Sequence, residues 1–571
     1  MAIDTGLRAA VEAWIADDPD ERDRAELRAL LAREAAEEEL RDRFAGRLTF
    51  GTAGLRGAVG AGPNRMNRAV VRAATAAVAG WLRDVRGASD PRSGPGAGTA
   101  PGETPAVVVG CDARHRSDEF ADEAARVLAG AGVRVHLLPR PGPTPLLAFA
   151  VRHLGVSAGI MITASHNPAA DNGYKLYLGD GAQVIPPVDA EIEGRIARLG
   201  PLSALPTAGL DDPLVVRHGD EVAAAYLDAV AGPAGTAAAA PGLTVVYTPM
   251  HGVAGDLMLR ALRRAGFAAP HVVAAQAKPD ADFPTVSFPN PEEPGALDLA
   301  LADARALGAD LVLASDPDGD RLAVAVPVPG GGTAGWRQLS GDQLGALLGA
   351  YLLGAETGGA PLVATTIVSS TLLSKIAASA GARYRETLTG FKWIARAADG
   401  EPGARFVFGY EEALGYQVGQ VVRDKDGIGA ALATLRLAAT AKAAGRSLSD
   451  AYDDLERAHG VHLTEQLSLR IPEPGEVMRR IRATPPAAIG GLSVETVTDF
   501  TDAGTGLPPS DVLRYTLRQA RVVIRPSGTE PKIKAYLEVI EPAGDDLAAA
   551  REAAARRMAP LRAAVIGLLA P

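Results

Sequence analysis

The sequence contains a single cysteine, Cys111, among 571 residues. One thiol cannot form an intramolecular disulfide, and it excludes a metal site built from several cysteines. The formal net charge of -10 argues against a surface that binds nucleic acid or an anionic membrane. An anionic small substrate would therefore need lysine and arginine side chains gathered locally at its site.

Long apolar stretches are scarce as well. The uncharged segment 357–374 contains Gly358, Gly359 and Pro361 beside many hydroxyl side chains, which makes it a poor membrane span. The N-terminus is acidic and helical in pattern, without the basic start and apolar run of a secretory signal. We therefore expect a soluble, cytoplasmic protein with no membrane or nucleic-acid partner.

The chain is long enough for three or four domains of about 150 residues each. Residues 5–46 predict a charged helical region, in which 21–43 carry the interleaved acids and bases typical of an exposed helix. Residues 87–105, rich in Gly, Pro and Ser, predict a mobile surface loop. From Ala106 onward the pattern alternates between strand and helix. Three expected helices end in Ala-Gly before a strand, at 131–132, 265–266 and 380–381.

This rhythm predicts an α/β fold, with three tandem α/β domains of mixed sheets followed by a C-terminal α+β domain after about residue 460. The expected boundaries are 1–215, 216–335, 336–458 and 459–571. Each of the first three domains delivers one polar loop, so we expect the domains to surround a central cleft.

The first polar loop is Thr163-Ala164-Ser165-His166-Asn167-Pro168, which follows the short apolar strand expected at 158–162. A serine at the end of a strand can be an exposed nucleophile or carry a phosphate. The alternative is a simple Ser/Asn turn. The nearby Gly155-Val156-Ser157-Ala158-Gly159 resembles a serine-hydrolase motif, but here a helix precedes the serine and a strand follows it, so we reject that interpretation.

A glycine-rich segment, 50–57, surrounds Arg56. Its glycines would let backbone approach a ligand closely while the arginine presents a guanidinium. The alternative is an ordinary glycine turn.

The second polar loop, 316–321, places Asp316, Asp318 and Asp320 at alternate positions after an apolar strand. Alternate side chains of extended backbone project to one side, and three carboxylates so close repel one another unless a cation lies among them. Oxygen ligands without His or Cys select Mg²⁺ or Mn²⁺. The alternative is a solvated acidic turn.

The third polar loop, 409–416, contains Glu411, whose carboxylate could accept hydrogen bonds from vicinal sugar hydroxyls. The alternative is that paired glutamates open a helix and stabilise its dipole. Segments 388–393 and 423–427 add cations that we expect at the same rim.

The fourth polar loop, 525–532, begins after the apolar strand expected at 521–524. One guanidinium, two hydroxyls and a glycine amide offer several donors to a tetrahedral oxyanion. The alternative is a polar hairpin loop.

Together the T-A-S-H-N-P, D-P-D-G-D-R, G-Y-E-E-A-L-G and R-P-S-G-T-E segments resemble the α-D-phosphohexomutase superfamily. The G-T-A-G-L-R-G, L-T-G-F-K-W and R-D-K-D-G-I segments are most similar to its phosphoglucomutase/phosphopentomutase branch. The resemblance implies a four-domain enzyme with a phosphoserine, one Mg²⁺ and a bisphosphorylated sugar intermediate, which also serves as activator.

The resemblance also implies roles for individual residues. Ser165 would carry the phosphate and contact the metal, which Asp316, Asp318 and Asp320 would bind. The implied acid/base and orienting residues are Arg56, His166 and Lys175. The implied substrate contacts are Arg321, Gly390, Lys392, Glu411, Ala413 and Lys425, and the implied phosphate site is Arg525, Ser527, Gly528 and Thr529.

One departure concerns Ala413, where many members of the superfamily carry a serine. The missing hydroxyl leaves the sugar open. We expect a phosphoglucomutase that interconverts sugar 1-phosphate and 6-phosphate. The alternatives are a phosphopentomutase, a phosphomannomutase, a sugar-1,6-bisphosphate synthase, a metal-dependent sugar phosphatase or a sugar-phosphate-binding regulator.

Overall fold

The computed structural model describes residues 3–49, 54–85, 104–232, 242–328, 335–356, 358–527 and 531–570. The loop expected at 87–105 lies almost wholly outside these residues. Contacts divide the chain into two compact units. The first comprises Met1–Ala239, Thr244–Ala323 and Val421–Leu432, and the second comprises Ala240–Leu243, Val324–Gln420 and Ala433–Pro571.

The first sheet has six strands in the order β1-β5-β4-β2-β3-β6. Its strands β2, β3, β4 and β6 run parallel, whereas β5 is antiparallel to both β4 and β1. Strands β2 and β4 are buried along their whole length, as expected for strands covered on both faces. The strands are β1 (Leu55–Ala58), β2 (Ala106–Cys111), β3 (Arg134–Leu137), β4 (Ala158–Ile162), β5 (Asp171–Leu178) and β6 (Val215–Arg217).

Helices flank this sheet, and their apolar faces join its core. The Ala-Gly pairs do end helices, since Gly132, Gly266 and Gly381 all have positive φ. The helices of this region are α1 (Thr5–Asp17), α2 (Glu21–Leu31), α3 (Glu37–Arg43), α4 (Arg68–Val85), α5 (Ser117–Gly130), α6 (Thr144–His153) and α7 (Val188–Ile196).

The second sheet has the order β11-β10-β9-β7-β8, with β7 parallel to β8 and β9, and β10 antiparallel to β11. Its strands are β7 (Val245–Thr248), β8 (His271–Val272), β9 (Leu311–Ser315), β10 (Leu322–Pro327) and β11 (Trp336–Gln338). The accompanying helices are α8 (Glu221–Ala231), α9 (Gly255–Arg264) and α10 (Asp298–Leu307).

The third sheet has the order β13-β12-β14-β15, with β12 parallel to β13 and β14, and β15 antiparallel to β14. Its strands are β12 (Ala360–Thr366), β13 (Arg383–Thr387), β14 (Ala404–Glu411) and β15 (Gly415–Val418). The helices are α11 (Gly341–Gly354), α12 (Leu372–Ser379), α13 (Phe391–Ile394), α14 (Gly427–Ala443) and α15 (Leu448–His459).

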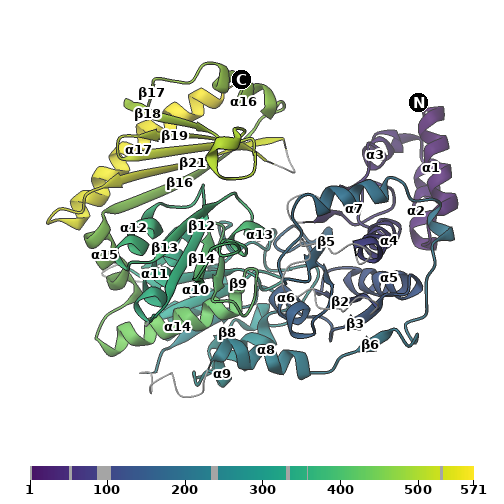
Figure 1. Ribbon diagram of the computed structural model, residues 1–571, viewed down its shortest axis with the longest axis horizontal. Coiled ribbons are helices and arrows are strands. Elements are labelled where there is room, and N and C mark those ends of the chain that lie inside the picture. The colour runs from purple at the N-terminus through teal and green to yellow at the C-terminus, as the bar shows by residue number, and fades with distance from the viewer. Residues whose placement is uncertain are drawn as a thin grey trace. The chain divides into compact units, whose positions relative to one another are not determined.

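The fourth sheet is antiparallel throughout, in the order β16-β21-β20-β19-β18-β17. Burial alternates along β19, as expected for a sheet with one covered face, and α17 lies along that face (Figure 1). The elements are β16 (Val461–Arg470), α16 (Pro474–Ala483), β17 (Ala488–Ile489), β18 (Leu492–Asp499), β19 (Leu513–Leu517), β20 (Ala520–Pro526), β21 (Lys532–Glu541) and α17 (Leu547–Leu569). The prediction of three mixed α/β sheets and a C-terminal α+β domain is confirmed.

No helix in the described ranges is both long enough and apolar enough to cross a membrane.

Candidate active site

Three neighbouring strands of the first sheet bring Arg56, Ser165 and Lys175 to one region of the first unit. Strand β5 lies between β1 and β4, with Arg56 opposite Gly173 and Met161 opposite Lys175. A Cβ atom at Gly173 would lie 2.6 Å from the Thr163 carbonyl oxygen and 2.7 Å from that of Leu55. Only glycine therefore lets the three strands approach this closely.

Ser165 lies directly beyond the end of β4, with φ of 53° and only 2% of its surface exposed. Its backbone N–H donates to Thr163 Oγ1 at 2.9 Å. Its Oγ donates to Asp316 Oδ2 at 2.9 Å and lies 3.2 Å from His166 Nδ1. The hydroxyl is therefore held at the edge of the aspartate cluster, in a left-handed backbone conformation that is costly for a non-glycine residue.

Asp316, Asp318 and Asp320 follow β9 and each offers a carboxylate oxygen within 4.8 Å of the other two. All three are buried, and the Oδ1 atoms of Asp318 and Asp320 accept no hydrogen bond from any described residue. A buried carboxylate oxygen without a donor is costly. Hard oxygen ligands that converge in this way fit a divalent cation, so the aspartate cluster is a metal site.

Two lysines partly offset the charge of the aspartate cluster. Lys175 Nζ donates to Asp318 Oδ2 at 2.6 Å and to Asp320 Oδ2 at 2.9 Å, and Lys425 Nζ lies 3.3 Å from the same Asp320 oxygen. Burial, followed by the charges of Asp318 and Asp320, raises the pKa of Asp316 well above its ordinary value. Burial also acts to raise the pKa of Asp318, but Lys175 and other donors hold that pKa below its ordinary value.

Lys425 reaches this site because aspartates on both sides of it are anchored in the first unit. Tyr177 donates its hydroxyl to Asp424 Oδ2 at 2.7 Å, and Tyr226 donates its hydroxyl to Asp426 Oδ1 at 2.8 Å. All four of these anchoring side chains are buried. Segment 423–427, which the sequence analysis expected at the rim of the sugar site, is thus held beside the aspartate cluster.

His166 and Arg56 lie beside the serine loop. Arg56 Nη1 donates to Asn167 Oδ1 at 2.8 Å. Burial, then the positive charges of Arg321 and Arg56, lowers the pKa of His166 well below its ordinary value, so the imidazole is neutral near pH 7. The Arg321 backbone N–H donates to Asp316 Oδ1 at 2.9 Å.

Arg114 binds the backbone of the serine loop and was not predicted from the sequence. Its guanidinium donates to the carbonyl oxygens of Ser165 (2.6 Å), Asn167 (2.5 Å), Pro168 (2.7 Å) and Asp171 (3.1 Å). It follows β2, which is parallel to β4, so the segments after both strands meet at one sheet edge. Its position after a buried strand was the signal that could have revealed it. Thr144, which donates to Asp318 Oδ2 at 2.6 Å, had no comparable signal.

Replacing Arg114 with glutamine is expected to destabilise the fold by about 3–5 kcal/mol, because it leaves Asp112 buried without its cation and removes donors from the loop carbonyls. Asp112 Oδ2 lies 3.4 Å from Arg114 Nε, and both side chains are almost fully buried. Thermal unfolding measures the effect, with Arg126→Gln as a control on the neighbouring helix. An unchanged unfolding midpoint would contradict this role.

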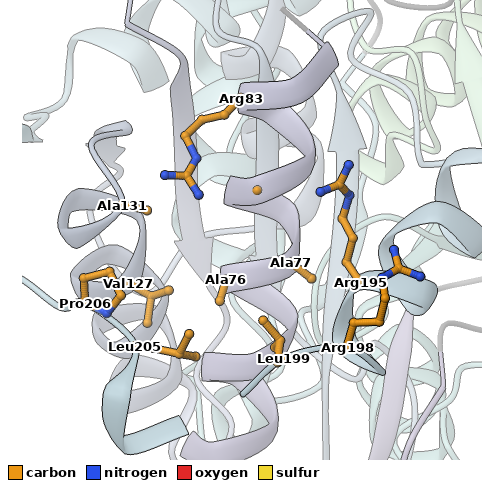
Figure 2. Close-up of a pocket in the computed structure, with 11 residues that line it drawn as sticks. Ala76, Ala77, Arg83, Val127, Ala131, Arg195, Arg198, Leu199, Leu205 and Pro206 are labelled. Carbon is orange, nitrogen blue, oxygen red and sulfur yellow. The ribbon is translucent and has the colours of Figure 1, made fainter. Parts of the chain in front are cut away.

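A groove on the first unit lies apart from these residues. It has a volume of about 280 Å³ and is lined by residues of α4 and α5, by the end of α7 and by the chain after it, including Arg83, Arg195 and Arg198 (Figure 2). None of the predicted site residues lines it.

In the second unit, Glu411 ends β14 and is 9% exposed, and its neighbour Glu412 turns toward the loop after β12. Ser369 Oγ and Thr366 Oγ1 donate to Glu412 Oε2 at 3.1 and 3.3 Å. Ala413 follows on the turn between β14 and β15. The sugar contact assigned to Glu411 from the sequence stays a prediction, and the buried contacts of Glu412 were not predicted.

Gly390 and Lys392 lie at the start of α13, also in the second unit. Gly390 has φ of 113°, which favours glycine. Lys392 is buried, and its Nζ lies 5.8 Å from the centroid of the Trp393 ring.

Arg525 lies near the end of β20, where its Nη2 donates to the Tyr536 hydroxyl at 3.3 Å. The Ser527 backbone N–H donates to the Lys532 carbonyl oxygen at 2.8 Å, which extends the antiparallel pairing of β20 with β21 by one hydrogen bond. Gly528 and Thr529 lie outside the described residues. Arg525 Nε is buried without a hydrogen-bond partner among the described residues.

Asp342 is a buried acid that contacts the residue before Glu411. Its Oδ1 accepts hydrogen bonds from the Ser370 N–H at 2.6 Å and from the Tyr410 hydroxyl at 3.0 Å. Burial raises the pKa of Asp342 to about 6; the Ser370 N–H opposes this shift, and the charge of Glu538 adds to it. Because the folded state holds this proton more tightly than the unfolded state, stability falls as pH rises from about 4 to about 6.

Asp342→Asn is therefore expected to stabilise the protein by about 1–3 kcal/mol at pH 8. The amide keeps an oxygen acceptor and removes the buried charge. The gain should vanish below about pH 4, where the aspartate is protonated in both states. Thermal unfolding of both proteins across this pH range measures the difference. A variant less stable than the wild type at pH 8 would contradict the assigned charge.

Family models match the chain in four consecutive segments. They are phosphoglucomutase/phosphomannomutase alpha/beta/alpha domains I, II and III, at residues 47–201, 224–330 and 340–458, and the C-terminal domain, at residues 471–555. The chain belongs to the phosphoglucomutase/phosphomannomutase family. It is a phosphosugar mutase, an isomerase that performs intramolecular phosphotransfer, and the resemblance to the α-D-phosphohexomutase superfamily is confirmed.

Relatives of this phosphosugar mutase carry several substrate names. A Haemophilus influenzae protein named "Probable phosphomannomutase" is 43% identical, over 76% of this chain and 88% of its own. A Staphylococcus haemolyticus phosphoglucomutase is 34% identical, over 87% and 91%. A Mus musculus phosphopentomutase is also 34% identical, over 95% and 92%. The names therefore cover mannose, glucose and pentose phosphates.

A solved phosphoglucomutase/phosphomannomutase family protein from Burkholderia thailandensis shares the fold of the mutase. It has a TM-score of 0.67 and 21% identity, and the match covers 91% of this chain and 97% of the other.

Proposed function

We propose that this mutase is a phosphoglucomutase that interconverts sugar 1-phosphate and sugar 6-phosphate. Ser165 would carry the phosphate, and Asp316, Asp318 and Asp320 would hold one Mg²⁺. The single observation that supports this most strongly is the 2.9 Å hydrogen bond from Ser165 Oγ to Asp316 Oδ2 at the edge of a buried carboxylate cluster. A serine beside a metal site suits phosphoryl transfer.

In the proposed reaction the bond between phosphorus and Ser165 Oγ breaks while a bond forms to the free hydroxyl oxygen of the sugar phosphate. The hydroxyl proton passes to a base, His166 or Lys175, while the Arg56 guanidinium orients the reacting groups. The sugar is then bisphosphorylated. After it turns, its other phosphate returns to Ser165 Oγ, and the proton returns to the released sugar oxygen. When bound, Mg²⁺ would withdraw charge from the transferring group.

The remaining contacts hold the sugar during this exchange. Glu411 would accept hydrogen bonds from vicinal hydroxyls, and Arg525 would hold whichever phosphate is not reacting. A sugar 1,6-bisphosphate would act as activator because it can rephosphorylate Ser165. The other proposed contacts are Arg321, Gly390, Lys392, Ala413 and Lys425 for the sugar and Ser527, Gly528 and Thr529 for the phosphate. We propose domain boundaries at 1–215, 216–335, 336–458 and 459–571.

The substrate is tested by offering glucose 1-phosphate, mannose 1-phosphate and ribose 1-phosphate separately, each with Mg²⁺ and a catalytic amount of sugar bisphosphate. Phosphorus NMR identifies the products. The proposal expects glucose 6-phosphate to form with the highest kcat/KM. Faster conversion of ribose 1-phosphate or mannose 1-phosphate would assign phosphopentomutase or phosphomannomutase activity instead. Net release of inorganic phosphate would indicate a phosphatase, and accumulation of bisphosphate from a separate donor would indicate a synthase.

A further inference from the structure

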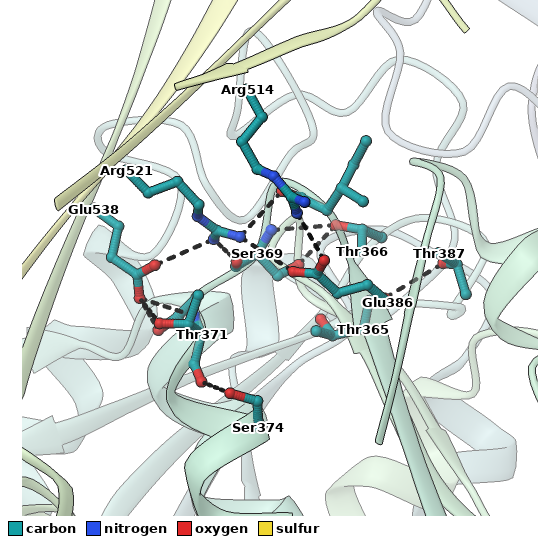
Figure 3. A network of polar contacts seen from close by, with 12 residues as sticks. Thr365, Thr366, Ser369, Thr371, Ser374, Glu386, Thr387, Arg514, Arg521 and Glu538 are labelled. Carbon is teal, nitrogen blue, oxygen red and sulfur yellow. Dashed lines mark hydrogen bonds and ion pairs between the residues drawn. The ribbon is translucent and has the colours of Figure 1, made fainter. Parts of the chain in front are cut away.

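The turn after β12, residues 366–371, is bound on one side by the C-terminal sheet. Arg521 of β20 donates to the carbonyl oxygens of Ile367, at 3.3 Å, and Ser369 (Figure 3). Its guanidinium also lies 3.2 Å from Glu538 Oε2 of β21. Both charged side chains are buried. The backbone of this turn is therefore held by a desolvated ion pair of the C-terminal sheet.

Glu538 completes the attachment from the same side. Its Oε1 accepts from Ser370 Oγ at 2.8 Å, from the Thr371 N–H at 2.8 Å and lies 2.9 Å from His462 Nδ1. Burial opposes its ionisation, but Arg521 and His462 hold the pKa of Glu538 at about 2. Glu538 is thus a carboxylate at neutral pH, with most of its hydrogen bonds directed at the turn.

The same turn also contacts residues 409–416, the sugar loop, which contains the proposed sugar contact Glu411. Ser369, whose carbonyl accepts from Arg521, donates its hydroxyl to Glu412 at 3.1 Å, and Thr366 donates to the same oxygen. Glu412 directly follows the proposed sugar contact Glu411. A continuous chain of hydrogen bonds therefore runs from the C-terminal sheet through the turn to the sugar loop.

In the C-terminal sheet, this series of hydrogen bonds is linked to Arg525, which begins the phosphate loop (525–532). Arg521 and Glu538 are paired in register, and the proposed phosphate ligand Arg525 lies four residues further along the same strand β20. Tyr536, which accepts from Arg525, lies two residues before Glu538 and packs with Ile367 and Val368 of the turn in one apolar cluster. Polar and apolar contacts thus link the same elements.

We propose that Ser369, Glu412, Arg521 and Glu538 form a polar latch that sets the position of the sugar loop relative to the phosphate loop. The inference rests on the proposed function, which gives Glu411 and Arg525 their roles. Moving one loop without the other would leave several buried polar groups unpaired, each at a cost. The latch residues are assigned as positioning residues, which act through Glu411 and Arg525 by holding these two proposed contacts at the separation that one sugar phosphate requires.

The latch predicts a specific kinetic effect. Arg521→Lys cannot donate to both carbonyls and Glu538 in the same geometry, and Ser369→Ala is a milder variant that removes only the hydroxyl bound to Glu412. Both are expected to raise the KM for the sugar phosphate by roughly 3- to 30-fold, the range found for mutations along packed networks. They should also increase escape of the bisphosphate, whereas Mg²⁺ affinity and phosphorylation of Ser165 stay unchanged.

Arg514→Lys is the matched control. Arg514 pairs with Glu386 at 2.8 Å, a carboxylate that Arg521 also contacts at 3.3 Å, but among the described residues it makes no hydrogen bond to the turn. Hydrogen–deuterium exchange of residues 409–416 in the free proteins reports on the loop without substrate. Faster exchange and higher KM in both latch variants, with neither change in Arg514→Lys, would support the inference.

Two outcomes would overturn the latch. In one, exchange of residues 409–416 is unchanged in Arg521→Lys and Ser369→Ala. In the other, exchange rises but KM and bisphosphate escape stay at wild-type values, which would make the network purely structural. A wild-type protein that converts no sugar phosphate would instead refute the proposed function, and the exchange result would still decide whether the latch holds the loop.

Discussion

Replacing Ser165 with alanine is expected to lower kcat by at least about 10⁴-fold, the scale seen when a nucleophile is removed. The reason is chemical, because the variant lacks the Oγ atom that carries the transferable phosphate in the proposed reaction. Ser165 Oγ is the hydroxyl bonded to Asp316 at the metal site. Turnover of glucose 1-phosphate measures the loss, and intact-mass analysis after incubation with a sugar bisphosphate should show one phosphate on the wild type and none on the variant.

Ser157→Ala is the matched control. Ser157 immediately precedes β4, whereas Ser165 lies beyond the other end of that strand. Among the described residues, the Oγ of Ser157 accepts a long 3.5 Å hydrogen bond from the Ala106 N–H. The Ser157→Ala variant should keep wild-type turnover and should still carry one phosphate on Ser165. The role assigned to Ser165 is refuted if Ser165→Ala retains activity or if the phosphate maps to another residue.

Removing the metal is expected to stop catalysis without unfolding the protein. Chelation with EDTA should abolish turnover, and added Mg²⁺ should restore it. Asp318→Asn should weaken Mg²⁺ binding by at least about 10-fold, because it replaces a charged oxygen ligand with a neutral one. Asp318 is buried and its Oδ1 has no hydrogen-bond donor among the described residues. Calorimetric titration with Mg²⁺ measures the affinity directly.

Asp282→Asn serves as the control for general electrostatics. Asp282 is an exposed acid that pairs with His115 outside the aspartate cluster, so its loss should leave Mg²⁺ affinity unchanged. Activity that survives exhaustive EDTA treatment would rule out the metal's role. Equal Mg²⁺ affinity in Asp318→Asn and the wild type would remove Asp318 from the ligand set.

The sequence by itself determined the elements and the reactive loops. Continuous apolar runs such as 158–162 predicted buried strands, and β4 has those bounds. The alternating aspartates predicted a shared metal site, on the expectation that side chains two residues apart in extended backbone project to one side. The structure has a turn there instead, in which the Gly319 N–H donates to the Asp316 carbonyl oxygen at 3.0 Å and Gly319 has φ of 71°. The convergence of the aspartates within 4.8 Å is confirmed. These features are local, since strand burial and residue spacing are written in short stretches of chain.

Contacts between distant parts of the chain were decided only by the tertiary structure. Lys425 lies 3.3 Å from Asp320, more than one hundred residues earlier, because Tyr177 and Tyr226 anchor its neighbouring aspartates. Sequence reasoning assigned this lysine to the substrate. No periodicity or spacing encodes which buried hydroxyl meets which carboxylate, since that depends on how whole sheets pack.

The same reason explains the residues that were missed altogether. Arg114 looked like one arginine among many, yet the parallel pairing of β2 and β4 places it beneath the serine loop. Arg521 and Glu538 read as ordinary charges on strands, but burial against the turn after β12 makes them partners of its backbone. A charged residue's role depends on its desolvation and its partners. The sequence shows the charge, but only the packing of the folded chain determines its desolvation and its partners.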